Sequence, residues 1–185
     1  MYLTEKPSDW TFELQTPTLG EEGATSTGYW EKMPEASVLY DGQVFDFREP
    51  LKAEAWSSWT DEGLAVSIRV QAFLSSPCSR CLEPADIEIL NDFMYLYTLR
   101  KEKRDDRPSE EDETQVVIVD RWRNFLDISD QVWESLILSL PLRVLCMAGC
   151  RGLCPVCGKS LNHGQCGCSP EKGDPRMEGL LGFLG

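Results

Sequence analysis

The sequence has few cations and a single histidine. Lys and Arg number 18 against 31 Asp and Glu among 185 residues, which gives a formal net charge of −13 at pH 7. This excess of negative charge argues against binding nucleic acid or an anionic membrane through overall charge. The lone His163 stands in a glycine-flanked turn, so it offers no Ser-His-Asp arrangement for nucleophilic catalysis. We therefore expect a protein that is not an enzyme.

Long apolar runs and several ligand-binding motifs are also missing. No stretch approaches the roughly 20 apolar residues that a membrane-spanning helix needs. The opening residues, MYLTEKPSDW, lack the apolar core of a signal peptide, so we expect a cytoplasmic protein without membrane contact. The sequence contains neither a glycine-rich phosphate loop nor an H-E-x-x-H motif, and we expect no small-molecule substrate.

Cysteines, in contrast, are abundant and clustered. A secreted disulfide framework usually spreads its bridges along the chain, whereas C-x-x-C pairs without a secretion signal are typical of metal sites. Six of the cysteines fall between residues 146 and 168. The candidate metal ligands are Cys78, Cys81, Cys146, Cys150, Cys154, Cys157, Cys166 and Cys168.

The cluster nearest the C-terminus has the more specific pattern. Cys154-Pro-Val-Cys157-Gly158 is typical of a zinc knuckle, because two intervening residues bring both thiolates to one side of a tight turn. The glycine permits the backbone twist that this turn requires. Cys166 and Cys168 form a second, shorter arm. Four thiolates make a closed tetrahedral site, so we expect Zn²⁺ here.

The other four cysteines form two pairs that are distant in sequence. Cys78 and Cys81 lie between two strand-like runs, and Cys146 and Cys150 follow a predicted helix. Since the count closes at four and four, we infer a second site that joins the middle of the chain to its end. The alternative, in which Cys146 and Cys150 share a metal with the C-terminal knuckle, stays open. We therefore expect one or two Zn²⁺ ions per chain.

Two other chemistries compete with structural zinc. Cys78 and Cys81 could form a thiol redox pair or a redox-sensing zinc site, since Arg80 between them could lower a thiol pKa. A thioredoxin-type pair needs its first cysteine at a helix N-terminus, however, and the residues after Pro84 alternate like a strand. Thiolate-rich sites also hold iron–sulfur clusters, so the spacing alone leaves zinc and iron open.

Strand-like alternation dominates the rest of the chain. Residues 64–74 place apolar side chains on one face and polar ones on the other, and residues 85–97 continue the alternation after the cysteine pair. Residues 38–47 are typical of a hairpin with an Asp41-Gly42 turn, and residues 116–119 predict a further short strand.

One helix is expected after these strands. Asp127 or Ser129 can cap it, an apolar stripe runs to about Leu140, and Pro141 ends it. The pattern predicts a β-rich α+β protein with antiparallel strands, one main helix and a zinc-ribbon-like C-terminal module. Its expected parts are an irregular segment 1–35 with an edge strand near residues 10–14, a β-rich body 36–145, a cysteine-rich zinc module 146–169, and a mobile tail 170–185.

Three motifs together suggest a family. Cys78-Ser-Arg-Cys81-Leu-Glu-Pro follows a strand, and the helix ends in Leu138-Ser-Leu140-Pro-Leu142. Cys150-Arg-Gly-Leu-Cys154-Pro-Val-Cys157-Gly-Lys-Ser-Leu161-Asn162 comes next. Over roughly residues 35–170 the chain resembles the bacterial YceD family, the large ribosomal RNA subunit accumulation proteins. The resemblance implies a role in accumulation or maturation of 23S ribosomal RNA, without specifying a reaction.

A partner in that pathway is a ribosomal protein or a large-subunit rRNA precursor. Any RNA or partner contact near the cysteines would use the local cations Arg80, Arg143, Arg151 and Lys159. Each four-thiolate zinc site adds a formal charge of −2, so an acidic body suits a basic ribosomal protein at least as well as RNA. The same acidity, without a basic recognition helix, counts against a DNA-binding zinc-ribbon regulator.

Overall fold

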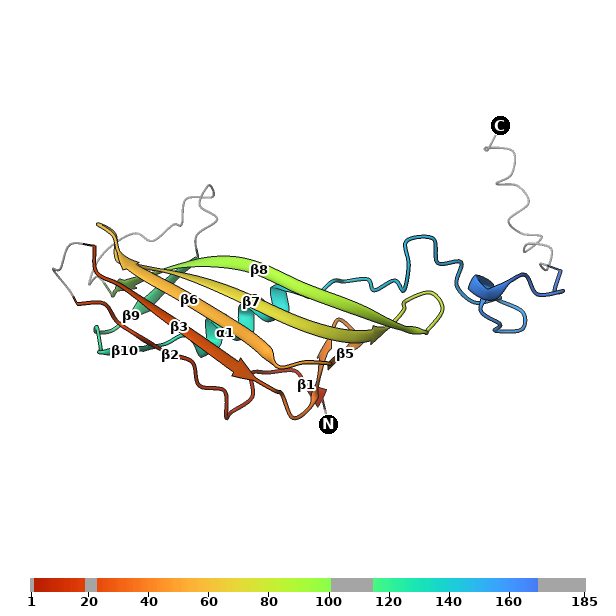
Figure 1. Cartoon of the computed structure of the whole chain (residues 1–185), viewed down its shortest axis with the longest axis horizontal. Coiled ribbons are helices and arrows are strands. Elements are labelled where there is room, and N and C mark those ends of the chain that lie inside the picture. The colour runs from red at the N-terminus through yellow and green to blue at the C-terminus, as the bar shows by residue number, and fades with distance from the viewer. Residues whose placement is uncertain (1, 19–22, 101–114, 170–185) are drawn as a thin grey trace, which may run out of the picture.

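The computed structural model describes residues 2–18, 23–100 and 115–169 (Figure 1). Within these ranges the chain forms one α-helix, one short 3-10 helix at Leu161–His163 and ten strands. The elements are β1 Tyr2–Leu3, β2 Glu13–Gln15, β3 Thr25–Lys32, β4 Ser37–Tyr40, β5 Gln43–Phe47, β6 Leu51–Trp59, β7 Leu64–Pro77, β8 Pro84–Leu99, β9 Gln115–Val119, β10 Phe125–Asp127 and α1 Ser129–Ser139.

The long strand β7 organises the main sheet. One of its edges pairs with β8 over its whole length, antiparallel, from Leu64 opposite Tyr97 to Pro77 opposite Pro84. Its other edge pairs with β6 as far as Gln71, and β5 takes over beyond the end of β6. Strand β3 extends the sheet beyond β6, β4 and β1 extend it beyond β5, and β9 extends it beyond β8. The β7–β8 hairpin therefore projects past its neighbours, towards the cysteine-rich end of the chain (Figure 1).

The predicted strand alternation is confirmed. The apolar residues of β7 at even positions from Leu64 to Leu74 are all buried. The expected hairpin is β4–β5, in which Asp41 and Gly42 have φ angles of 47° and 74°. Two consecutive positive φ angles are the geometry of a type I′ turn, which matches the twist of the flanking strands.

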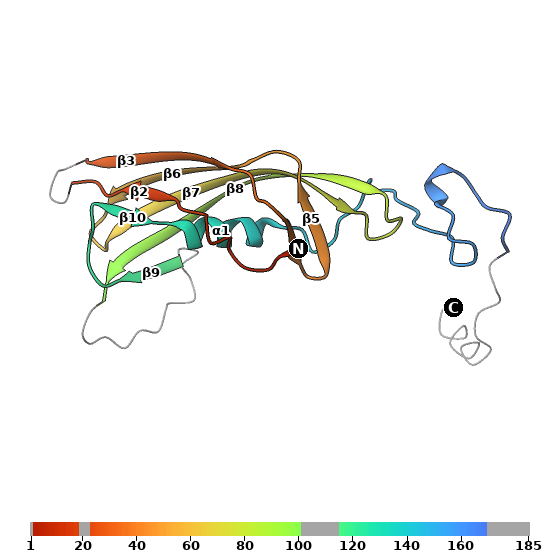
Figure 2. The same ribbon diagram turned by 90° about the horizontal axis from the view of Figure 1, so that it is seen from below.

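Helix α1 lies against one face of this sheet (Figure 2). Val132 and Leu136 are fully buried there, within the hydrophobic core. The hydroxyl of Tyr95 on β8 lies 3.0 Å from that of Ser135, which fastens the helix to the sheet. Ile128 takes the N-cap position, and Asp127 Oδ1 accepts a hydrogen bond from the Ser129 backbone N–H at 2.9 Å.

Residues 1–35 were expected to be irregular, and this prediction is wrong for residues 25–32. They form β3, which pairs with β6 along its whole length. The sequence did not predict this strand because it carries little apolar alternation. One of its inward-facing positions is Gly28, which is covered by the Trp30 side chain: a Cβ at residue 28 would lie 2.1 Å from the indole ring. The expected edge strand near Trp10 is β2, at Glu13–Gln15, while Trp10 and Phe12 enter the core from irregular backbone.

The fold class is confirmed as strand-rich with a single α-helix in the described ranges, but the sheet is mixed. Strands β8 and β9 run parallel, as do β1 and β4. Alternation indicates a strand and not its direction, so the parallel pairs could not be expected. The predicted tail 170–185 lies outside the described residues.

Candidate metal centres

The eight cysteines form two groups of four. Two of them, Cys78 and Cys81, lie in the turn between β7 and β8, and the other six lie in the segment after α1, which runs past this turn at the same end of the molecule (Figure 1). Within each group, all four sulfurs lie within 4.8 Å of one another. The first group is Cys78, Cys81, Cys146 and Cys150, and the second is Cys154, Cys157, Cys166 and Cys168. The structure thus shows the four-and-four grouping, and the alternative pairing of Cys146 and Cys150 with the C-terminal knuckle is not found.

The first group joins the hairpin end to the segment after α1. The Ser79 backbone N–H donates to the Val144 carbonyl at 2.8 Å, and the Val144 N–H donates to Ser79 Oγ at 3.3 Å. Nearby, Arg80 Nη1 donates to the Cys150 carbonyl at 2.8 Å. These three bonds hold together two segments that are far apart in the sequence.

The two C-x-x-C turns share one backbone geometry. The Leu82 N–H donates to the Cys78 carbonyl at 2.9 Å, just as the Gly158 N–H donates to the Cys154 carbonyl at 2.9 Å. In both turns the first cysteine N–H also donates to the carbonyl five residues later, at 2.8 Å. Leu82 and Gly158 have φ angles of 64° and 71°, so Leu82 adopts the left-handed conformation that normally favours glycine. The sequence did not indicate this likeness, because leucine follows the first C-x-x-C pair where glycine follows the second.

The sulfur geometry fits a metal better than disulfides. Cys78 and Cys150 sulfurs lie 3.7 Å apart, and Cys81 and Cys146 sulfurs lie 3.5 Å apart. A disulfide bond would bring two sulfurs to about 2.05 Å. A tetrahedral zinc site with Zn–S bonds of about 2.3 Å separates its sulfurs by about 3.8 Å. Four thiolates at this spacing are a donor set that could hold a soft metal ion.

One thiol of each group is strongly disposed to keep its proton in the metal-free protein. A hydrogen bond with Cys81 is the largest influence on Cys146 and raises its pKa to about 12. Cys157 acts in the same way on Cys168 and raises its pKa to about 12. A metal ion must displace both protons, since the thiolate is the ligand form.

Another thiol of each group is disposed to lose its proton. The backbone N–H groups of Cys157 and Val156 lower the pKa of Cys154 to about 6. Burial raises the pKa of Cys78, but several hydrogen bonds, led by the Arg80 backbone N–H, outweigh it and bring the pKa to about 6. Backbone amides pointing at sulfur stabilise negative charge there, which favours metal binding.

Asn162 connects the two groups. It belongs to the short 3-10 helix between the two arms of the second group, yet its Nδ2 lies 3.4 Å from Cys150 Sγ and 3.9 Å from Cys146 Sγ. Its Oδ1 accepts a hydrogen bond from the Arg151 N–H at 2.8 Å, which fixes the amide orientation. The hydrogen bond from Asn162 Nδ2 to Cys150 Sγ is the largest cause of the lowered pKa of Cys150. The sequence pattern did not indicate this role of Asn162.

His163 is not within either cysteine group. Its Nε2 lies 3.0 Å from Glu83 Oε1, so it links the segment that carries the second cysteine group to the turn that carries Cys78 and Cys81. Its side chain is 70% exposed, in line with the expected solvated turn residue. The nearby Ser160 hydroxyl and the contact with His163 lower the pKa of Glu83.

The four cations expected near the cysteines all lie in the segments that carry the cysteines, and they are exposed. Arg80 already donates to the Cys150 carbonyl, so its guanidinium is partly committed to the protein itself. The three that are not so engaged are Arg143, Arg151 and Lys159.

A family model described as "Large ribosomal RNA subunit accumulation protein YceD" matches residues 66–184, which include all eight cysteines. The chain belongs to the YceD family. This agrees with the resemblance carried by the cysteine motifs and the end of the helix.

The chain is also similar in sequence to proteins of other organisms. The chain is 30% identical over 126 residues to uncharacterized proteins of Mycobacterium tuberculosis and Mycobacterium bovis, a match that covers 67% of this chain and 57% of each relative. It is 26% identical over 136 residues to an Arabidopsis thaliana protein named "Large ribosomal RNA subunit accumulation protein YCED homolog 1, chloroplastic", covering 62% of this chain and 42% of the relative. The chain thus spans little more than half the length of its mycobacterial relatives. No solved structure matches it.

The described residues of this YceD chain contain no helix long and apolar enough to cross a membrane.

Proposed function

We propose that this YceD chain is a non-enzymatic, zinc-stabilised factor that supports the accumulation of large-subunit ribosomal RNA. The observation that carries the proposal is that the family match spans two complete groups of four cysteines. The family description indicates the process, which is the accumulation of large-subunit rRNA. Metal binding by the two cysteine groups would account for the folded structure of the C-terminal end.

Zinc is the metal we propose for both groups. Zn²⁺ with four thiolates is a closed site that stabilises local structure and leaves no open coordination position for a substrate. Such a site explains why a segment with little apolar content between residues 146 and 168 is ordered, since metal binding and folding are linked. This favours a binding factor over a metal-dependent enzyme.

We propose a basic ribosomal protein as the direct partner, in preference to the rRNA precursor. The chain carries a formal net charge of −13, and two filled sites would add negative charge at the end where the local cations lie. A ribosomal protein brings the opposite charge. Pull-down from lysate with and without nuclease tests this choice, and loss of every ribosomal partner after RNA digestion would overturn it.

The thiol redox alternative has less support. Cys78 is fully buried and Cys81 is 4% exposed, whereas reactive thiols need access to their substrate. The same two sulfurs lie next to those of Cys150 and Cys146, which makes them shared ligands and not an isolated pair.

The test is complementation of a strain that lacks the gene. We expect this strain to have a reduced ratio of large-subunit to small-subunit rRNA. The wild-type protein should restore the normal ratio, whereas Cys81→Ser/Cys146→Ser should not. Met147→Ser is the matched control, because it also removes a sulfur from this segment, but at a side chain that is 52% exposed. An unchanged ratio in the deletion strain would refute the pathway, and full rescue by Cys81→Ser/Cys146→Ser, which lacks two ligands of the first group, would refute the role of that metal site.

A further inference from the structure

The face of the main sheet that points away from α1 is covered by no other element of the described residues (Figure 2). Strand register places Trp56 and Met94 in one row of this face, on either side of Ser67, and Leu96 and Val116 in the next row. Large apolar side chains gathered on an uncovered face are typical of interaction sites. We define the outer apolar patch as Trp56, Ala65, Met94, Leu96, Val116 and Ile118.

The patch is strongly exposed and contains a hollow. Met94 is 52% exposed, Val116 58% and Ile118 53%. A hollow of about 480 Å³ opens between Met94, Leu96 and Val116, and the small side chain of Ala65 lies within it. The β6–β7 turn borders the hollow with two exposed carboxylates, Asp61 and Glu62.

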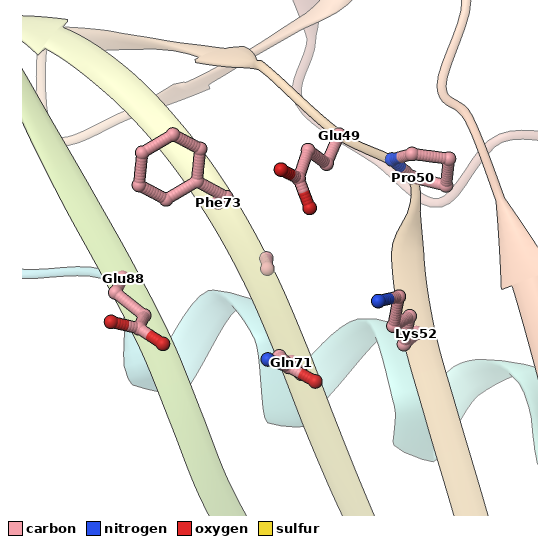
Figure 3. A pocket seen from close by; sticks show the side chains of 7 residues that line it. Glu49, Pro50, Lys52, Gln71, Phe73 and Glu88 are labelled. Atoms are coloured by element: carbon pink, nitrogen blue, oxygen red, sulfur yellow. The ribbon is translucent and has the colours of Figure 1, made fainter.

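A second hollow of about 190 Å³ lies on the same face, nearer the hairpin end. Figure 3 shows Glu49 and Glu88 on either side of the strand that carries Phe73 and Gln71. Two carboxylates beside an aromatic ring suit a Lys or Arg side chain, which can form ion pairs and lie over the ring.

Carboxylates outnumber cations over the whole outer face. Arg69 is bound through Nε and Nη2 to both carboxylate oxygens of Asp92, at 2.7 and 3.0 Å, and lies over the Trp56 ring at 5.4 Å. Lys52 is the other cation among the outward-facing residues of β3, β6, β7 and β8, and the exposed Arg48, whose N–H donates to the Phe73 carbonyl, lies beside the face. The remaining carboxylates on or beside the face are Glu31, Asp46, Glu49, Glu54, Asp61, Glu62, Asp86 and Glu88.

We propose that this outer face is a docking surface for a cationic protein segment with apolar anchor residues. An apolar side chain of the segment fills the hollow between Met94, Leu96 and Val116, and its Lys or Arg side chains pair with carboxylates such as Asp61 and Glu88. The inference stands on this face alone; only the identification of the segment with a large-subunit ribosomal protein rests on the proposed function.

The sign of the charge decides between protein and RNA here. Phosphates brought against these carboxylates are repelled, so nucleic-acid affinity would have to come from elsewhere on the chain. An apolar anchor also matches the patch, whereas an RNA backbone offers none. The cationic residues near the cysteines lie in the β7–β8 turn and after α1, and not on this face, so the two regions can be tested separately.

The experiment uses the immobilised full chain and two probes: the proteins extracted from purified large ribosomal subunits, and those extracted from small subunits, both nuclease-treated. We expect one or a few basic large-subunit proteins to bind, less tightly as salt rises. Met94→Lys/Val116→Lys should weaken that binding by about tenfold or more, since anchor residues dominate interface affinity. Leu138→Lys is the matched control, because Leu138 is 54% exposed on α1, and it should bind like wild type.

Each outcome separates this proposal from the function above. Undiminished binding of a large-subunit protein to Met94→Lys/Val116→Lys overturns the docking surface and leaves the function standing. Binding of a small-subunit protein that these substitutions abolish supports the surface and contradicts the function. Binding of no protein from either subunit overturns the surface. Asp61→Lys/Glu62→Lys, in an exposed turn, repeats the test by charge should the first variant fail to fold, and it should weaken binding in the same way.

Discussion

Replacing Asn162 with Leu should weaken metal binding at the first cysteine group, although Asn162 lies within the second. The substitution keeps a side chain of similar size and removes the Nδ2 donor that lies 3.4 Å from Cys150 Sγ and 3.9 Å from Cys146 Sγ. A hydrogen bond to a charged acceptor contributes about 1.5–3 kcal/mol, which corresponds to about a ten- to hundredfold loss of affinity. The loss should fall on one of the two metal ions only.

Competition with a chromophoric zinc chelator measures both affinities in one titration. We expect two equivalents per chain in wild type, and in Asn162→Leu one equivalent that the chelator removes about ten- to a hundredfold more readily. Repeating the titration in a Cys78→Ser/Cys81→Ser background, which lacks the first site, assigns the effect. There, Asn162→Leu should leave the affinity of the remaining site unchanged.

Two results would refute this reasoning. Equal affinities of wild type and Asn162→Leu would show that the amide contributes nothing to the first group. An equal weakening of the remaining site in the Cys78→Ser/Cys81→Ser background would show that Asn162 acts on its own module alone. Arg151, whose N–H donates to Asn162 Oδ1, contributes only backbone here, so Arg151→Ala should retain both affinities and serves as the control.

Further expectations concern the two groups and the core. Cys154→Ser should lose one metal equivalent while the far-UV circular dichroism of the sheet is kept; loss of the strand signal would contradict a separable module. Cys78→Ser should lower the melting temperature, because its site ties the hairpin end to the segment after α1, and an unchanged melt would argue against that tie. Zinc added at pH 7 should release protons from Cys146 and Cys168, whose pKa values are about 12, so the affinity for zinc should fall as pH falls. Calorimetry in two buffers of different ionisation enthalpy would measure the number of protons released, and a value of zero would contradict this expectation. Leu136→Ala, at a fully buried helix position, should cost about 2–5 kcal/mol in urea unfolding; a loss below about 1 kcal/mol would mean the site collapses around the smaller side chain.

The sequence predicts those parts of the fold in which local residue patterns are specific. Strands β7 and β8 and the β4–β5 hairpin could be predicted because one face of each is apolar or because its turn requires particular residues. Strand β3 could not, since its core-facing side is Gly28 beside Trp30, and the run 51–59 of β6 mixes Ala, Ser and Trp in a way that alternation alone does not distinguish.

The candidate site divides in the same way. Cysteine spacing, together with the cysteine count, favours two groups of four, because a C-x-x-C turn constrains both sulfurs locally, but it leaves open which knuckle Cys146 and Cys150 join. It cannot show that Asn162 reaches from one group to the other, since that contact depends on how the second module sits against Cys150. Nor does it show the left-handed backbone at Leu82, where a residue other than glycine occupies the position that Gly158 holds in the other turn.

The first cysteine group draws two of its sulfurs from the hairpin end and two from beyond α1, with Cys81 and Cys146 separated by 65 positions. By loop-closure entropy, joining ends that far apart costs about 2 kcal/mol more than closing the short loop between the two arms of the second group. Only a finished sheet with α1 in place offsets that difference, so the second group is expected to fill first during folding. A chain whose synthesis stops before Cys146 would have a complete hairpin and half of the ligands. Occupancy of the first group is therefore a chemical record that the whole body has been made and folded.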